Sequence, residues 1–320
     1  MSLRSLSTDQ LFAAAVDGDR GALARLLSLV ERGGAEARAV GRLSYPRSGA
    51  GYTVGLTGAP GAGKSTLTSA TIGFLRARGD EVAVLAIDPS SPFTGGAILG
   101  DRVRMQDHAT DPGVFIRSMA TRGHLGGLSL ATPEAVRLLD AVGRRWILVE
   151  TVGVGQVEVE IAGKADTTVV VVNPGWGDSV QANKAGLMEI ADVFVINKAD
   201  RKGVDETRRD LEQMLDLSDL PHDAWRPPIV SVVATERRGV DELWATVERH
   251  RATIEVSGEL DRRRRFRLRE ELREIVARRL EQRARDIVSG ERWDSLQVQV
   301  AERSIDPWSA ADEMLGPVGA

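Results

Sequence analysis

Short hydrophobic runs alternate with longer polar segments through the middle of the chain. The runs lie at residues 52–56, 82–87, 114–116, 146–149, 167–172, 193–196 and 229–233. They are hydrophobic on both faces, and the segments between them are long enough for helices. This pattern is typical of a parallel sheet covered on both sides. We therefore expect an α/β fold with a mostly parallel, doubly wound sheet flanked by helices.

The residues before this alternating region have helical spacing instead. Ser7 to Gln10 form a Ser-x-x-Gln capping pattern, and hydrophobic residues then recur every three or four positions as far as Val30, with Gly18 as an interruption. Glycines and a proline in residues 45–51 favour a linker. We interpret residues 1–49 as a helical extension and residues 50–255 as the α/β domain.

Beyond residue 255 the strand-like runs cease. Residues 261–286 have a charged helical pattern, with one hydrophobic side made of Phe266, Leu272, Ile275, Val276 and Leu280. We interpret residues 256–320 as a C-terminal helical arm whose hydrophobic side packs against a second copy of the chain. The consecutive arginines 262–265 would suit nucleic acid, but acidic residues interleave with the arginines of this segment, which favours a solvated helix surface.

The composition of the chain excludes several kinds of chemistry. The chain has 320 residues, a net charge of −4 and no cysteine. Without thiols there is no disulfide, no thiolate-bound metal and no cysteine nucleophile. The near balance of charges gives no reason to expect binding to nucleic acid or to a membrane surface. No hydrophobic stretch approaches the ~20 residues that cross a bilayer. No targeting pattern is present either, so we expect a cytoplasmic protein.

A phosphate-binding pattern follows the first predicted strand. Residues 58–66 read Gly-Ala-Pro-Gly-Ala-Gly-Lys-Ser-Thr, which fits G-x-x-x-x-G-K-[ST]. Backbone N–H groups of such a loop surround phosphates, Lys64 reaches the β- and γ-phosphate oxygens, and Ser65 offers a hydroxyl to Mg²⁺. Ala59 stands where ATPases of the deviant-loop group carry an extra lysine, which argues against that group. The expected nucleotide contacts here are Gly58, Ala59, Pro60, Gly61, Ala62, Gly63, Lys64, Ser65 and Thr66.

A base-reading pattern, Asn197-Lys198-Ala199-Asp200, follows the sixth predicted strand. Asp200 can accept hydrogen bonds from the ring N–H and the exocyclic amine of guanine, Asn197 can contact the other edge of the base, and the Lys198 stem can cover its plane. Adenine has no such donor pair, so the pattern favours GTP over ATP. The residues expected to support the guanine from the next strand are Ser231, Val232 and Val233.

Acidic residues end or follow three of the predicted strands, at the edge of the sheet where ligands bind in open parallel sheets. We expect Mg²⁺ to be held, directly or through water, by Ser65, Asp88, Asp101 and Glu150. The expected catalytic residues are Lys64, Asp88, Glu150 and Gln156. The run from Glu150 to Gln156 departs from the D-x-x-G-Q of Ras-like GTPases, because its acid is Glu and its glutamine lies three positions after Gly153. We therefore expect slow intrinsic hydrolysis.

Together with the runs 88–91, 95–102 and 186–192, these motifs resemble those of the MeaB/ArgK family of methylmalonyl-CoA mutase-associated GTPases. The resemblance covers most of the chain. It implies a homodimeric GTPase that binds the adenosylcobalamin-dependent mutase, gates cofactor loading, and protects or reactivates that enzyme. It also implies GTP, GDP and Mg²⁺ as ligands, and a C-terminal dimerisation arm.

The same resemblance implies three switch segments. Residues 88–104 resemble the first switch, residues 151–160 the second, and residues 173–184 the third, which relays the nucleotide state to the mutase. Trp176 replaces the small residue that is usual between two glycines of the third switch. The expected partner-facing residues are Trp176, Asp178, Gln181 and Lys184.

Two other functions stay open on the sequence. Nickel-insertion GTPases belong to the same branch, but they usually carry Cys/His sites or His-rich tails, whereas this chain has four scattered histidines and no cysteine. A transport-associated kinase or ATPase is an older interpretation of the family. The guanine-reading pattern argues against it, because a kinase that uses ATP has no need of a guanine reader.

Overall fold

The structure, a computed structural model, describes residues 5–88, 106–108, 110–120, 127–151, 164–175, 189–217 and 224–316. The chain divides into two compact units, Met1–Arg267 and Leu268–Ala320. The boundary between them falls within a single long helix, residues 259–287.

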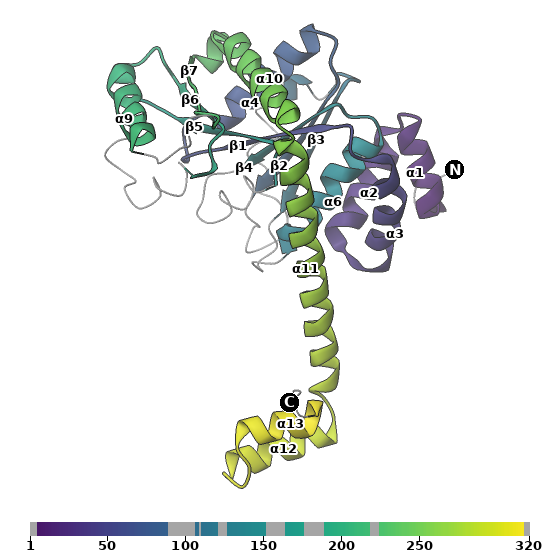
Figure 1. Ribbon diagram of the computed structural model, residues 1–320. Helices are drawn as coiled ribbons and strands as arrows, with labels where there is room; N and C mark the ends of the chain where they lie inside the picture. Colours follow the sequence, from purple (N-terminus) through teal and green to yellow (C-terminus); the bar gives the residue numbers. More distant parts are fainter. Residues whose placement is uncertain are drawn as a thin grey trace. The chain divides into compact units, whose positions relative to one another are not determined.

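A seven-stranded sheet forms the centre of the first unit (Figure 1). Its strands are β1 (Tyr52–Thr57), β2 (Val82–Asp88), β3 (Val114–Ala120), β4 (Trp146–Thr151), β5 (Thr167–Val172), β6 (Val193–Asn197) and β7 (Ile229–Val232). Their order across the sheet is β3-β2-β4-β1-β5-β6-β7, and every neighbouring pair is parallel. The prediction of a doubly wound parallel sheet is confirmed. All seven predicted runs form strands, the third of which extends to Ala120.

Helices cover both faces of the sheet. On one face lie α4 (Lys64–Ala77) and α10 (Val240–Val256), which share a core with alternate strand residues such as Val54 and Leu148. The helices on the other face are α1 (Thr8–Val16), α2 (Arg20–Arg32), α3 (Gly34–Ser44), α6 (Gly127–Ala141) and α9 (Val204–Asp216). Of these, α9 packs against β5 and β6, and the others pack against β2, β3 and β4. Short 3₁₀ turns lie at Tyr45–Arg47, Gln106–His108 and Ala234–Glu236.

The N-terminal helices share their core with the sheet. The predicted capping box is present at α1, where Ser7 Oγ accepts from the Gln10 N–H and the Gln10 side chain accepts from the Ser7 N–H. The side chains of Leu26 and Leu27 in α2 are fully buried, in one cluster with strand residues such as Leu85. The predicted break at Gly18 separates α1 from α2. A third helix, α3, adds to the two that were expected.

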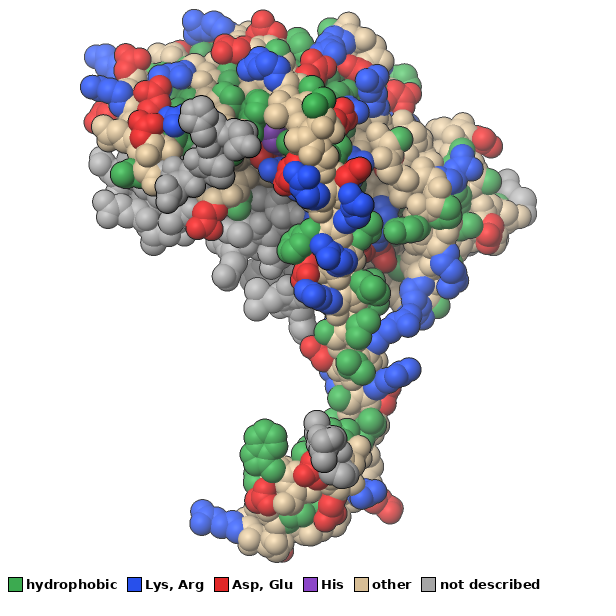
Figure 2. All heavy atoms as spheres, in the orientation of Figure 1, with side chains coloured by type: hydrophobic (Ala, Val, Ile, Leu, Met, Phe, Trp, Pro, Cys, Tyr) green, Lys and Arg blue, Asp and Glu red, His purple; other side chains and the backbone are tan. Residues whose placement is uncertain are grey.

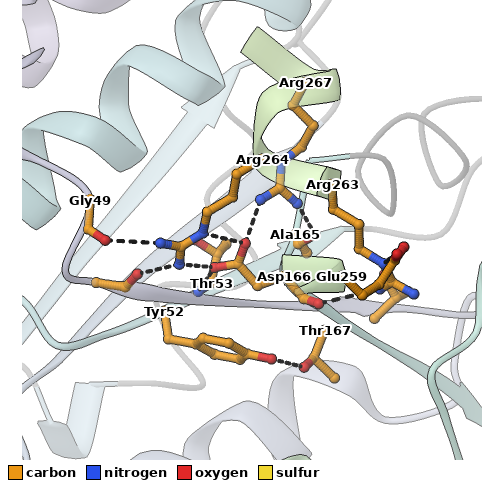
Figure 3. A network of polar contacts seen from close by, with 12 residues as sticks. Gly49, Tyr52, Thr53, Ala165, Asp166, Thr167, Glu259, Arg263, Arg264 and Arg267 are labelled. Atoms are coloured by element: carbon orange, nitrogen blue, oxygen red, sulfur yellow. Dashed lines mark hydrogen bonds and ion pairs between the residues drawn. The ribbon is translucent and has the colours of Figure 1, made fainter. Parts of the chain in front are cut away.

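A network of buried charges joins the helix α11 (Glu259–Ile287) to the edge of the sheet where the strands begin (Figure 3). Asp166 and Asp192 directly precede β5 and β6, and their side chains are 2% and 10% exposed. Arg264 contacts Asp166 at 2.7 Å, and Arg263 contacts Asp192 at 3.0 Å. These contacts make the first two turns of α11 part of the first compact unit, which ends at Arg267.

The second unit consists of the rest of α11, α12 (Glu291–Ala301) and α13 (Pro307–Leu315). Leu296 of α12 and Ala310 of α13 are buried, and the Arg292 side chain donates to the backbone O of Glu313. Hydrophobic side chains stay exposed along the α11 part of this unit (Figure 2), among them Leu272 at 61% and Leu280 at 58%. None of the helices in the described part of the chain is long and apolar enough to span a bilayer.

Candidate nucleotide-binding site

The predicted phosphate loop connects the carboxyl end of β1, in the middle of the sheet, to the first residue of α4. Lys64 and Ser65 therefore lie in the first turn of a helix, whose free N–H groups and dipole favour an anion. β4 and β6 run parallel to β1 and end at the same edge of the sheet. The last residues of these strands, among them Glu150 of β4 and Asn197 of β6, thus lie beside the loop and the start of α4, as expected for an open parallel sheet.

Two glycines let the loop lie directly against neighbouring strands. Gly58 has φ of 136°, and a Cβ atom there would lie 2.0 Å from the backbone O of Val171 in β5. Gly63 has φ of 91°, and a Cβ atom there would lie 2.4 Å from Nδ2 of Asn197 at the end of β6. Any side chain at either position would push the loop away from the strands that carry the base-reading residues. The glycines are therefore required by packing as well as by backbone conformation.

The side chain of Lys64 folds back over the loop. Its Nζ donates to the backbone O of Gly58 at 2.6 Å and of Ala59 at 3.1 Å. Lys64 is only 6% exposed, and the Thr68 hydroxyl donates to its backbone O at 3.0 Å. A positive charge is thus held inside the ring of backbone groups, where the oxygens of a bound phosphate would need it.

Ser65 and Glu150, two of the predicted metal ligands, are brought together. The Ser65 hydroxyl donates to Glu150 Oε1 at 2.5 Å, although the residues are 85 positions apart in the chain. Glu150 is 2% exposed and lies in β4, between Leu56 of β1 and Ala86 of β2. A hydroxyl beside a carboxylate at the mouth of a phosphate loop fits Mg²⁺, which takes few protein ligands and completes its shell with water and phosphate.

The remaining predicted ligands are described only in part. Asp88 is the last residue of β2, so its backbone reaches the same edge of the sheet, but its side chain lies outside the described atoms. Asp101 and Gln156 lie outside the described residues. The same holds for the predicted partner-facing residues Trp176, Asp178, Gln181 and Lys184.

Asn197 ties the base-reading loop to the phosphate loop. Its Nδ2 donates to the backbone O of Ala62 at 2.9 Å, and its Oδ1 accepts from the N–H of Ala234 at 3.2 Å. Asn197 is 2% exposed, so it acts as a buried bridge between loops that follow β1, β6 and β7. Its amide is engaged with backbone groups on both sides. In the described structure it therefore holds the base-reading loop, the phosphate loop and the loop after β7 together.

The next residues of the motif face outward. Lys198 has φ of 57°, in the left-handed region, and its Nζ donates to the backbone O of Gly61 at 2.6 Å. Its stem therefore runs from the base-reading loop to the phosphate loop, as a cover for a base requires. Asp200 is exposed, so its carboxylate is accessible to a ligand.

The residues predicted to support guanine lie at the carboxyl end of the last strand, Ser231 and Val232 in β7 and Val233 directly after it. Val232 and Val233 are 0% and 3% exposed, so their side chains belong to the core. The Ser231 hydroxyl accepts from Arg208 of α9 at 3.0 Å. Two contacts beside these residues were not predicted: the backbone N–H of Ala234 donates to Asn197, and the guanidinium of Arg208 donates to Ser231. No local pattern could have indicated them, because both contacts join segments from separate strands and helices.

The parallel sheet, the glycine loop leading into α4 and the lysine held inside that loop define a P-loop nucleoside triphosphatase of the GTPase class. The family described as Methylmalonyl Co-A mutase-associated GTPase MeaB matches residues 23–288, and the chain belongs to this family.

Individual proteins agree with this assignment. A Pyrococcus abyssi protein, provisionally named a GTPase, is 53% identical over 309 residues, covering 96% of this chain and 95% of its own. The methylmalonic aciduria type A homolog of Mus musculus is 35% identical and covers 80% of this chain and 66% of its own. The crystal structure of a protein named LAO/AO transport system kinase has a TM-score of 0.70 at 28% identity and covers 96% of both chains.

Proposed function

We propose that this GTPase is a chaperone of an adenosylcobalamin-dependent methylmalonyl-CoA mutase, gating cofactor loading and protecting or reactivating the mutase. The observation that carries the proposal is the family match over residues 23–288, whose description names association with that mutase. The name of the mouse relative, which refers to methylmalonic aciduria, points to the same metabolism. A related acyl-CoA mutase that uses the same cofactor is the nearest alternative partner.

The chemistry of the proposal is attack of water on the γ-phosphoryl group of GTP, giving GDP and phosphate. Lys64, held inside the phosphate loop, balances the charge on the β- and γ-phosphate oxygens. Ser65 and Glu150 would hold Mg²⁺, which supplies further positive charge at the transferred phosphoryl group when bound. Asp88 and Gln156 are proposed to act on the metal and on the attacking water.

Base selection in the proposal rests on Asp200, whose exposed carboxylate would accept from the two donors on one edge of guanine. Lys198 would cover the base with its stem, and Asn197 would keep the base-reading loop in register with the phosphate loop. The base and the phosphates of the nucleotide would thus be bound by two loops that contact each other directly.

Dimerisation is a further part of the proposal. The exposed hydrophobic side of α11 beyond Arg267 carries Leu272, Val276 and Leu280, a surface that a second copy of the chain would cover. Residues 256–320 would then form the dimerisation arm. Residues 173–184 would face the mutase. A cytoplasmic location completes the proposal.

The experiment is to measure GTP turnover with and without purified methylmalonyl-CoA mutase, together with co-elution of the two proteins on a sizing column. We expect co-elution and a faster turnover in the complex. The Lys64→Met variant is the matched control, because it retains the partner surface and removes the charge that hydrolysis requires. Absence of both co-elution and a change in rate would refute the chaperone role without affecting the GTPase assignment.

One competing function, phosphorylation of a protein by a nucleotide, is suggested by the name of the structural neighbour, LAO/AO transport system kinase. Comparing ATP with GTP as substrate separates the two functions. We expect turnover with GTP, with release of inorganic phosphate to water rather than transfer to protein.

A further inference from the structure

One side chain, Arg208, joins α9 to the edge strand β7 beside the base-reading loop. Its Nη1 donates to the backbone O of Ile229, and its Nη2 donates to the hydroxyl of Ser231, both at 3.0 Å. Both acceptors belong to β7, and both donors come from one planar guanidinium. A lysine could not reproduce this contact, because it has a single nitrogen on a flexible stem.

The contact lies on the open side of β7. This strand is the last in the sheet order, and among the described strands it pairs with β6 alone. The backbone O atoms of Pro228 and Val232 point toward β6, since they accept from the N–H groups of Phe194 and Ala199. Successive carbonyls of a strand point to opposite sides, so the O atom of Ile229 points away from β6. Arg208 therefore supplies the donor that a further strand would otherwise provide.

The same open edge is closed further along by the returning loop. A Cβ atom on Gly239 would lie 2.4 Å from the backbone O of Ser231, so the loop that ends at Gly239 lies directly on the strand. Val233 and Arg238 exchange backbone hydrogen bonds of 3.0 and 3.3 Å across this loop. Arg208 and the loop together leave little of the short edge strand exposed to competing partners.

This loop also carries a contact to the base-reading motif. The Ala234 N–H donates to Oδ1 of Asn197, whose Nδ2 in turn donates to the phosphate loop. Residues 233–238 are held partly by the burial of Val233 and Ala234 and partly by contacts on either side of β7. On the β6 side the contact is with Asn197, and on the outer side Arg208 holds the strand from which these residues continue.

We propose that Arg208 is a positioning residue for the guanine nucleotide: by fixing the open edge of β7, it holds residues 233–238 against Asn197 and slows nucleotide release. The inference rests on the proposed base-reading role of Asp200 and on the proposed role of Asn197 in joining the base-reading loop to the phosphate loop. Short edge segments with few neighbours open more often than central strands. Loss of the two hydrogen bonds from Arg208 therefore makes residues 233–238 open more often beside the base-reading loop. Lys64, Ser65 and Glu150 keep their places on α4 and β4.

The test compares four variants for release of a fluorescent GDP analogue and for single-turnover GTP hydrolysis. Arg208→Met should release the analogue about tenfold faster, the equivalent of ~1.4 kcal/mol, with an unchanged single-turnover rate. Arg208→Lys should be intermediate, and Ser231→Ala should show a smaller increase. Arg209→Met is the matched control, because Arg209 is exposed on the same helix and its Nε donates only within α9, to the backbone O of Asp205.

Release by Arg208→Met at the wild-type rate would overturn the inference. Equally fast release of the GDP analogue by Arg209→Met would also overturn it, and so would an equally large loss of single-turnover hydrolysis in Arg208→Met. Either result would indicate a general weakening of the fold. If Arg208→Met does not fold, unchanged release in both Arg208→Lys and Ser231→Ala overturns it. Failure of the wild-type protein to bind the GDP analogue would contradict the proposed function, and this inference with it.

Discussion

Arg264 donates two hydrogen bonds to the carboxylate of Asp166, one of 2.7 Å from Nη2 to Oδ2 and one of 3.1 Å from Nε to Oδ1 (Figure 3). The same guanidinium donates to the backbone O atoms of Gly49 and Gly51, each at 2.8 Å. Asp166 also accepts from the N–H of Thr53 at the start of β1. One ion pair thus joins α11, the segment before β1 and the start of β5 within the first compact unit.

Removal of this arginine should destabilise the first unit. Arg264→Met removes two hydrogen bonds to the buried carboxylate of Asp166 and leaves Arg267 as its ion-pair partner, so the cost should stay below the about 3–5 kcal/mol of leaving a buried charge unpaired. Arg265→Met is the control, because Arg265 is exposed and its one hydrogen bond within the described residues goes to the backbone O of Asp261. We expect its effect to stay within about 0.5 kcal/mol. The measurement is urea unfolding followed by circular dichroism, and equal midpoints for the two variants would contradict the prediction.

Acid should weaken the same network. Burial by itself raises the pKa of Asp166, but the hydrogen bond from Arg264 and the charges of Arg267 and Arg264 outweigh it and hold this pKa below its ordinary value. The pKa of Asp192 is also lowered. Burial alone would raise it, but the hydrogen bond from His250 and the charges of His250 and Arg263 outweigh that effect. The unfolded state therefore takes up protons first as the pH falls. The stabilisation is complete above the unfolded value of about 3.9 and is lost below it.

The check is the free energy of unfolding at pH 5.5 and at pH 3, for the wild type and for Arg264→Met. The variant has already lost part of the interaction that lowers the pKa of Asp166, so its free energy should fall less between the two pH values. A difference between wild type and variant that is the same at both pH values would contradict this assignment.

The pair of Ser65 and Glu150 should govern the dependence of hydrolysis on Mg²⁺. Ser65→Ala and Glu150→Gln should each slow GTP hydrolysis by about 10²- to 10³-fold, the usual effect of removing one group that stabilises charge in a transition state. Both should raise the Mg²⁺ concentration that gives half-maximal rate. GDP binding in the presence of EDTA serves as the control and should stay near the wild-type value. Retention of Mg²⁺-dependent hydrolysis in Glu150→Gln, together with its loss in Asp88→Ala, would make Asp88 the main ligand instead.

Nucleotide preference should depend on Asp200. Asp200→Asn replaces one carboxylate oxygen with a donor and removes the charge. GTP binding should weaken by about 10²- to 10³-fold, because one hydrogen bond to guanine is lost and the other no longer has a charged acceptor. The xanthine nucleotide XTP has an oxygen in place of the exocyclic amine of guanine, so Asp200→Asn should bind XTP better than GTP. Because Asp200 is exposed, the melting temperature should stay unchanged. Asp205→Asn, on the exposed side of α9, is the control, and equal GTP affinity in the two variants would disprove a base-reading role.

The hydrophobic side of α11 should determine the oligomeric state. Leu272→Glu places a charge among residues that a second copy would bury, so the variant should be monomeric on a sizing column with light scattering. Arg273→Glu changes the neighbouring exposed position, where the side chain pairs with Glu270. It should leave a dimer intact. A wild-type protein that is already monomeric at micromolar concentration would remove the dimer from the proposal.

The sheet and the chemistry of its loops were predictable from local sequence. The strand residues are hydrophobic on both faces, so their positions could be predicted without knowledge of the neighbours, and Gly58–Thr66 and Asn197–Asp200 have spacings that follow from phosphate and base geometry. The capping of α1 by Ser7 and Gln10 was predictable for the same reason, since all its contacts lie within four consecutive residues.

How these local features meet depends on contacts between distant parts of the chain, which become visible in the fold. Asn197 bridges to Ala62 and Ala234, Ser65 meets Glu150, and Arg264 meets Asp166 across 98 positions of the chain. In the sequence, the arginines of residues 262–267 cannot be told apart. In the fold, Arg263, Arg264 and Arg267 contact buried aspartates, whereas Arg262 and Arg265 are exposed. That difference depends on the packing of α11 against the starts of β5 and β6, because a guanidinium gains from a carboxylate only where both are brought out of water in the right geometry.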